Sequence, residues 1–119
     1  MGRRQPRGLK VVRAVQAAMP DGVELDELDL ATLDAIRRTF DRAEALDADL
    51  ARERASDEPS ANRIALLSAE ARLAEAQGEK WGREVVRAAQ AVLEESRKNP
   101  DKQRAARARW SGAAAGKAL

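Results

Sequence analysis

The chain has 119 residues, a formal net charge of +2, no cysteine and no histidine. The missing thiols and imidazoles exclude disulfides, thiolate and imidazole catalysis and the usual zinc sites, which leaves carboxylates and lysines as the catalytic candidates. Alanine, arginine, glutamate and leucine dominate, and aromatic residues make up only 3%, which is typical of helical proteins with coiled-coil character. We therefore expect an all-α protein that is not an enzyme and that carries neither a cofactor nor a metal.

The charge is unevenly divided along the chain. Residues 1–20 carry five bases and no acid, residues 21–60 carry 13 acids and five bases, and residues 101–119 carry five bases and one acid. Basic clusters at both ends fit binding to a phosphate backbone, and the alternative is that they only keep the chain soluble. We predict DNA contacts at nine basic residues: Arg3, Arg4, Arg7, Lys10, Arg13, Lys102, Arg104, Arg107 and Arg109.

Residues 1–22 are predicted to form a basic N-terminal arm that is partly disordered. Within it, residues 9–19 fit a short helix that ends before the turn residues 20–22 and carries four apolar residues on one side: Leu9, Val12, Val15 and Met19. Arg13 interrupts the apolar run, which excludes a signal peptide. No segment approaches the roughly 18 apolar residues that a membrane span needs.

Residues 23–98 are predicted to form a helical hairpin. Its first helix runs from about Leu25 or Asp29 to about Arg54, with acids at its start, as the helix dipole favours. Apolar residues three or four apart form one stripe on this helix: Leu33, Ile36, Phe40, Ala43, Leu46 and Leu50.

A connector over residues 55–61 separates the two helices of the hairpin. Pro59 prevents a helix from running through it, and Ser56 or Asp57 is expected to cap the helix that follows. The second helix runs from about Ser60 to about Lys98. Its small and apolar residues alternate spacings of three and four: Ile64, Leu67, Ala71, Ala74, Gly78, Trp81, Val85, Ala88 and Val92.

Four heptads of this kind predict packing of helix on helix. Gly78 and Gly82 each disfavour a helix, so the sequence predicts either a bend there or the close approach of another helix. A hairpin of two amphipathic helices cannot cover all of its apolar surface by itself. The sequence therefore predicts a homo-oligomer in which neighbouring subunits cover it. Core and oligomer contacts are expected at nine residues: Leu33, Ile36, Phe40, Leu46, Leu50, Ile64, Leu67, Trp81 and Val85.

Residues 99–119 are predicted to form a basic, partly disordered C-terminal segment. Asn99–Pro100 ends the second helix, and residues 101–110 fit a short basic helix that ends at Trp110. The stretch from Gly112 to Ala118 is similar to a phosphate-binding loop. It has three residues between its glycines instead of four and no Ser or Thr after Lys117. We therefore expect no nucleotide site and no small-molecule substrate.

The layout resembles the small terminase subunits of phages that infect actinobacteria. The resemblance covers residues 29–112 and rests on a basic arm, a helical hairpin with a short connector, and the stretch RAARARWSG near the end. It implies a packaging protein in the cytoplasm of the infected host that forms rings of about eight to twelve subunits. Such a ring would bind double-stranded viral DNA and recruit the large terminase subunit, which holds the ATPase and nuclease.

One departure from that family is clear. Many small terminases begin with a helix-turn-helix domain, and residues 1–28 are too short for such a module, which leaves DNA contact to the basic ends. Two other classes of protein stay open. One is a helical scaffold or adaptor whose heptads pair with another protein, and the other is a small dimeric DNA-binding regulator.

Overall fold

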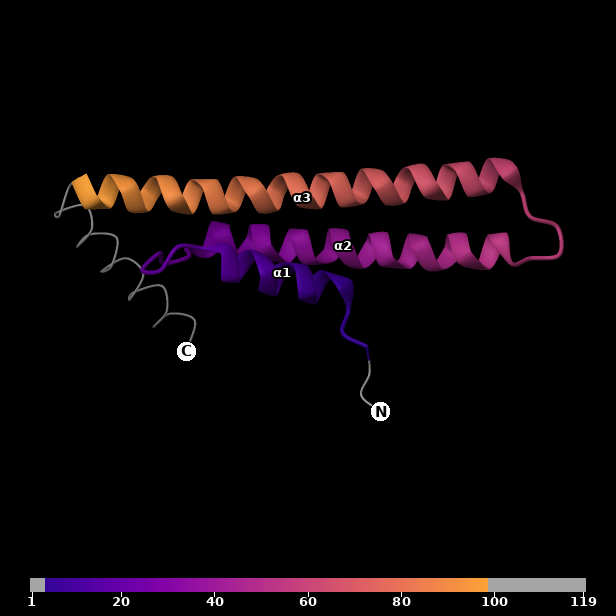
Figure 1. Cartoon of the computed structure of the whole chain (residues 1–119), viewed down its shortest axis with the longest axis horizontal. Coiled ribbons are helices and arrows are strands. Elements are labelled where there is room, and N and C mark those ends of the chain that lie inside the picture. Colours follow the sequence, from indigo (N-terminus) through magenta and orange to yellow (C-terminus); the bar gives the residue numbers. More distant parts are fainter. Residues whose placement is uncertain (1–3, 99–119) are drawn as a thin grey trace.

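A computed structural model describes residues 4–98 of the chain as three helices, α1 (Arg7–Ala18), α2 (Glu27–Arg54) and α3 (Ala61–Lys98). No strand occurs among these described residues, so the all-α prediction is confirmed. The helices α2 and α3 run antiparallel as a hairpin, and α1 lies against it with the same direction as α3 (Figure 1). Five predicted DNA contacts lie outside the described residues: Arg3, Lys102, Arg104, Arg107 and Arg109.

The start of α2 is fixed by two of the acids that the sequence places there. The Asp29 backbone N–H donates to Asp26 Oδ1 at 2.8 Å, and the Asp26 N–H donates to Asp29 Oδ2 at 3.0 Å. This reciprocal capping box satisfies two backbone N–H groups that the first turn of a helix leaves without partners. A cap of this kind contributes about 1 kcal/mol to the stability of a helix.

The start of α3 is capped by a different residue from the two that we predicted. Ser60 Oγ accepts the N–H of Arg63 at 3.2 Å, as an N-cap does. The prediction of Ser56 or Asp57 was wrong because both belong to the loop that follows α2. The Ser56 hydroxyl donates to the carbonyl oxygen of Glu53 at 2.8 Å and so completes the last turn of α2.

The core lies between α2 and the middle of α3. Ile36 is fully buried, and Phe40 is 6% exposed. The other buried apolar side chains include four of the predicted positions, while three more predicted positions, Leu46, Ile64 and Trp81, are half-buried. The buried apolar set is Leu33, Ile36, Phe40, Ala43, Leu50, Leu67, Ala71, Val85 and Ala89.

The buried face of α3 departs from the predicted heptad stripe after Val85. Val92 is 53% exposed and Ala88 is exposed, whereas Ala89 and Ser96 are buried. The buried face of this end of α3 continues from Gly82 to Ala89 and Ser96, which follow one another at seven-residue spacing. The prediction was wrong there because it continued the stripe through Ala88 and Val92, on a neighbouring side of the helix.

The two glycines of α3 mark close approaches of other helices and not a break. The helix runs without interruption through Gly78 and Gly82, which are both buried. A β-carbon at Gly78 would overlap the ring of Phe40, lying 2.8 Å from its Cδ2 atom. A β-carbon at Gly82 would lie 3.3 Å from Val15 Cγ2 of α1. The missing side chains therefore make room for α2 at one turn and for α1 at the next.

The short helix that we predicted over residues 9–19, within the basic N-terminal arm, is confirmed as α1, and it packs against the hairpin. Gly8 of α1 is buried against α2, and a β-carbon there would overlap the carbonyl oxygen of Arg37. Val12, Val15 and Met19 pack against the core cluster. The helix α1 packs mainly on α2 and meets α3 at few positions. Residues 7–18 are thus part of the folded body.

Candidate nucleic-acid interface

Three of the predicted DNA contacts lie on the surface of α1 or just before it. Arg4, Lys10 and Arg13 are exposed, and none of them forms an ion pair within the described residues. Lys10 and Arg13 stand on the side of α1 opposite Gly8, Val12 and Val15, which face the hairpin. These three cations are therefore free to meet phosphate groups, which is what a backbone-binding surface requires.

Arg7 differs from these three because it faces the hairpin. Its Nη1 atom lies 2.8 Å from Asp47 Oδ2 on α2 and 2.9 Å from Glu75 Oε1 on α3. The hydrogen bond to Asp47 raises the pKa of the Arg7 guanidinium above its usual value, against the opposing effect of burial. Arg7 thus joins all three helices, and carboxylates of α2 and α3 balance its charge within the chain.

Carboxylates of α2 also cap the start of α1. The Gly8 N–H donates to Asp41 Oδ1 at 2.9 Å, and the Arg7 N–H donates to Glu44 Oε1 at 3.3 Å. The first turn of α1 holds no acid, and Pro6 at its N-cap makes no side-chain hydrogen bond. The neighbouring helix therefore supplies the acceptors and the negative charge that the N-terminus of a helix needs.

A row of acids on α2 is the signal for this arrangement in the sequence, and we did not predict its role. Asp41, Glu44 and Asp47 follow one another at three-residue spacing beside the buried stripe of α2. Residues three apart are neighbours on a helix surface, so these acids form one row. Neighbouring negative charges repel one another, so such a row beside the core is stabilised by a cation. Arg7 is that cation.

Replacing Arg7 with glutamine should loosen α1 without unfolding the hairpin. Both of its ion pairs are partly exposed, so we expect a loss of about 1 kcal/mol in the free energy of unfolding. Hydrogen exchange of the α1 backbone amides should accelerate more than that of α2 and α3. Arg13→Gln is the matched control, because Arg13 lies on the same helix and forms no ion pair with any residue between 4 and 98. Equal effects of the two changes would contradict the anchoring role of Arg7.

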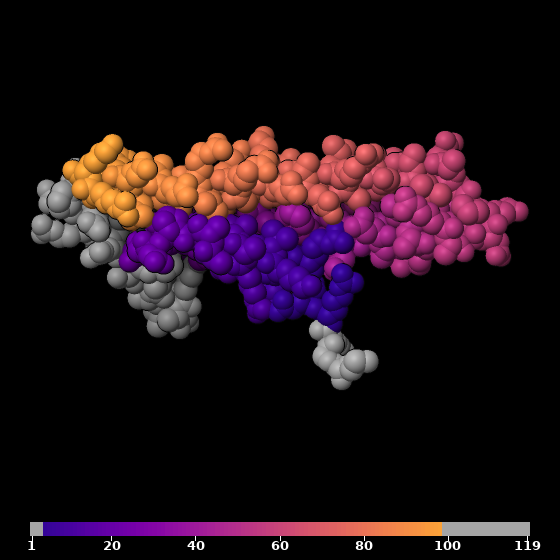
Figure 2. Space-filling model, in the orientation of Figure 1, coloured from indigo at the N-terminus to yellow at the C-terminus, as the bar shows by residue number. Residues whose placement is uncertain are grey.

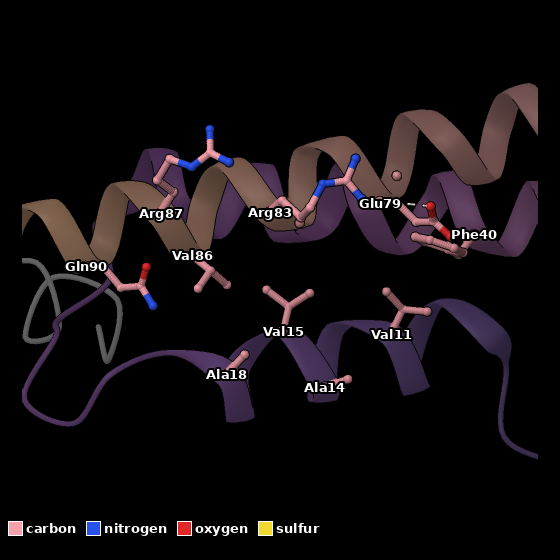
Figure 3. A pocket seen from close by; sticks show the side chains of 12 residues that line it. Val11, Ala14, Val15, Ala18, Phe40, Glu79, Arg83, Val86, Arg87 and Gln90 are labelled. Carbon is pink, nitrogen blue, oxygen red and sulfur yellow. Dashed lines mark ion pairs between the residues drawn. The ribbon is translucent and has the colours of Figure 1, made fainter.

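An apolar groove of about 530 Å³ separates α1 from α3 on the side away from α2 (Figure 3). Valine and alanine side chains of α1 face Val86 across it, and Phe40 forms part of its lining. Polar side chains on its α3 edge include Arg83, whose Nη1 lies 4.0 Å from Glu79 Oε2. The lining is Val11, Ala14, Val15, Ala18, Phe40, Gly78, Glu79, Gly82, Arg83, Val86, Arg87 and Gln90.

The other end of the hairpin exposes large apolar side chains. Leu66 is 60% exposed and Leu73, seven residues further along α3, is 71% exposed. Figure 2 shows that α1 covers only part of the hairpin and leaves the end near the α2–α3 loop without a third helix. Residues seven apart lie on one side of a helix, so the two leucines offer a surface for contact with another protein.

The described part of the chain contains no group of three or more acidic side chains placed to hold a metal ion. None of its helices combines the length and the apolar content that a membrane span requires. Comparisons with protein-family models, curated proteins and solved structures found no match to this chain.

Proposed function

We propose that the chain is a DNA-binding, non-enzymatic component of viral genome packaging, of the small terminase type. It assembles as a homo-oligomeric ring, binds double-stranded viral DNA through its basic ends, and recruits the large terminase subunit in the host cytoplasm. The observation that carries the proposal is the free basic surface formed by Lys10 and Arg13 on α1 and Arg4 just before it. Arg7 is removed from the predicted DNA contacts because the carboxylates of α2 and α3 balance its charge.

Oligomerisation is supported by the exposed leucines at heptad spacing on α3. A hairpin with a third helix over only part of its length leaves apolar surface that a neighbouring subunit can cover. Native mass spectrometry tests this directly. A mass of about eight or more subunits supports the ring, whereas a monomer or dimer favours a small regulator or an adaptor and contradicts the packaging role.

Removing the free cations should weaken DNA binding in proportion to the number of phosphate groups that they neutralise. We expect Lys10→Ala with Arg13→Ala to lower the slope of log K against log salt by up to about two units, because each phosphate contact contributes about 0.9. The triple change Arg104→Ala, Arg107→Ala, Arg109→Ala should lower it by up to about three units. Fluorescence anisotropy with a labelled duplex at several salt concentrations measures both slopes.

Arg7→Gln is the control for this experiment. It removes one positive charge from the same helix, but that charge faces Asp47 and Glu75, so the salt slope should stay unchanged. An unaltered slope in the α1 double variant would contradict the proposed interface. Tight association with another protein, without any affinity for DNA, would instead support the scaffold alternative.

A further inference from the structure

The three helices occupy three corners of a four-helix arrangement. The helices α1 and α2 pack together, as do α2 and α3, while α1 and α3 meet at few positions. Since α1 and α3 point the same way and α2 runs opposite to both (Figure 1), this is the relation of successive helices in an up-down-up-down bundle. The groove between α1 and α3 is the place of the fourth helix in such a bundle.

We propose that residues 101–110 of the same chain fill this groove as the fourth helix, with Trp110 seated between Ala18 and Val86. This docking goes beyond the proposed function and does not depend on it. The topology fits, because an antiparallel helix that follows α3 after a short connection is the next step of an up-and-down bundle. Asn99–Pro100 directly after Lys98 supplies the helix stop that such a turn needs.

The length of the segment matches the distance to the groove. Gln90, at the near end of the groove lining, is eight residues before Lys98 on α3, about 12 Å along the helix axis. A ten-residue helix over 101–110 covers about 15 Å. Running back along α3, it would bring Trp110 level with Gln90 and Val86.

The chemistry of the segment also fits. Ala106 and Trp110 are four residues apart and would share one face of a helix. Trp110 is the one large apolar side chain of residues 101–110. The groove it would enter is walled by valines and alanines, and burial of an indole side chain there removes a large apolar area from water.

Charge at the entrance of the groove favours a basic occupant. The α1–α2 loop, which carries Asp21 and Glu24, lies at the same end of the molecule as Lys98 (Figure 1). Glu24 Oε2 is shielded from solvent and has no hydrogen-bond partner in the described structure. A docked helix over residues 101–110, which carry four bases, would bring positive charge next to this loop. On the groove rim, Arg83 is already paired with Glu79. Among the lining residues, Arg87 is then the positive charge that would repel a basic helix.

Thiol protection tests the docking in the chain of 119 residues, which has no cysteine of its own. Ala14 and Ala17 are both exposed on α1, but only Ala14 lines the groove. We expect the thiol of Ala14→Cys to react at least about tenfold more slowly with a bulky maleimide than that of Ala17→Cys, which corresponds to about 1.4 kcal/mol of docking. Adding Trp110→Asp should bring the Ala14→Cys rate up to the Ala17→Cys rate.

Each outcome decides the question. Equal rates for the two single variants, or a slow Ala14→Cys rate that persists with Trp110→Asp, overturns the docking. Protection should not change between about 1 μM and 100 μM protein. Protection that appears only at the higher concentration, together with a doubled mass in light scattering, means that a second copy fills the groove and also overturns the proposal. No DNA is present, so failure of DNA binding cannot be mistaken for failure of docking.

Fluorescence of Trp110 gives a second readout that does not depend on thiols. In a Trp81→Phe chain shown by circular dichroism to keep its helical content, we expect the emission maximum to be blue-shifted from that of the urea-unfolded chain. The shift should vanish with Ala14→Glu and persist with Ala17→Glu. An emission maximum equal to that of the unfolded chain would overturn the docking.

Discussion

Replacing Gly78 with alanine is expected to lower the free energy of unfolding by about 1–3 kcal/mol, the usual range for overpacking a core. The new β-carbon would overlap the ring of Phe40, a core side chain that is 6% exposed, so the ring would have to shift from its packed position. The same change at Gly82 should leave stability unchanged or raise it. There the β-carbon meets one methyl of Val15 at 3.3 Å, and alanine favours a helix over glycine by about 1 kcal/mol. Urea unfolding followed by circular dichroism compares the two variants.

A change of Phe40 provides the control that identifies the cause. In a Phe40→Leu background the ring is gone, so Gly78→Ala should become stabilising by up to about 1 kcal/mol, its helix-propensity gain. Replacing Phe40 with leucine should therefore reverse the sign of the stability change caused by Gly78→Ala, but not of that caused by Gly82→Ala. If Gly78→Ala stabilises the chain that retains Phe40, the close packing of α2 on α3 at this turn is wrong.

Gly8→Ala is expected to have the second large effect, a loss of about 2–3 kcal/mol. A β-carbon at Gly8 would overlap the carbonyl oxygen of Arg37 and lie 2.6 Å from Asp41 Oδ1. Backbone cannot turn aside as a flexible side chain can, so α1 must move off α2. That movement breaks the hydrogen bond from the Gly8 N–H to Asp41 and withdraws Val12 and Val15 from the core cluster.

Hydrogen exchange resolved by segment is the measurement for Gly8→Ala. Protection of residues 9–18 should be lost first, while α2 and α3 keep most of theirs. Gln16→Ala is the matched control, since it adds an alanine to the same helix at an exposed position and should raise stability slightly. Retained protection of α1 in Gly8→Ala would contradict the close contact with Arg37.

The sequence predicts the bounds of the two long helices well because the signals for them are local. The acids before Glu27, the apolar stripe from Leu33 to Leu50 and Pro59 in the connector place both long helices within a few residues of their observed ends. Each of these signals acts within one or two turns of the helix that it defines. No knowledge of the packing of other helices is needed to read them.

The sequence predicts less where packing decides the outcome. Beyond Val85 the apolar pattern of α3 favours Val92, but the structure buries Ala89 and Ser96 and leaves Val92 53% exposed. The role of Arg7 depends on Glu75, 68 residues away, which no local pattern reveals. The local sequence does not distinguish an arginine that binds DNA from one that pairs with a carboxylate of its own chain.

The capping of α1 by α2 has a consequence for the order of folding. A 12-residue helix is at the lower limit of what is stable alone in water, and α1 carries no cap of its own. Its hydrogen-bond acceptors, Asp41 and Glu44, are more than 30 residues further along the chain. During synthesis α1 leaves the ribosome before α2, yet it has no stable place to fold until most of α2 has followed. Of these two helices, the one made earlier is therefore the one that acquires its structure later.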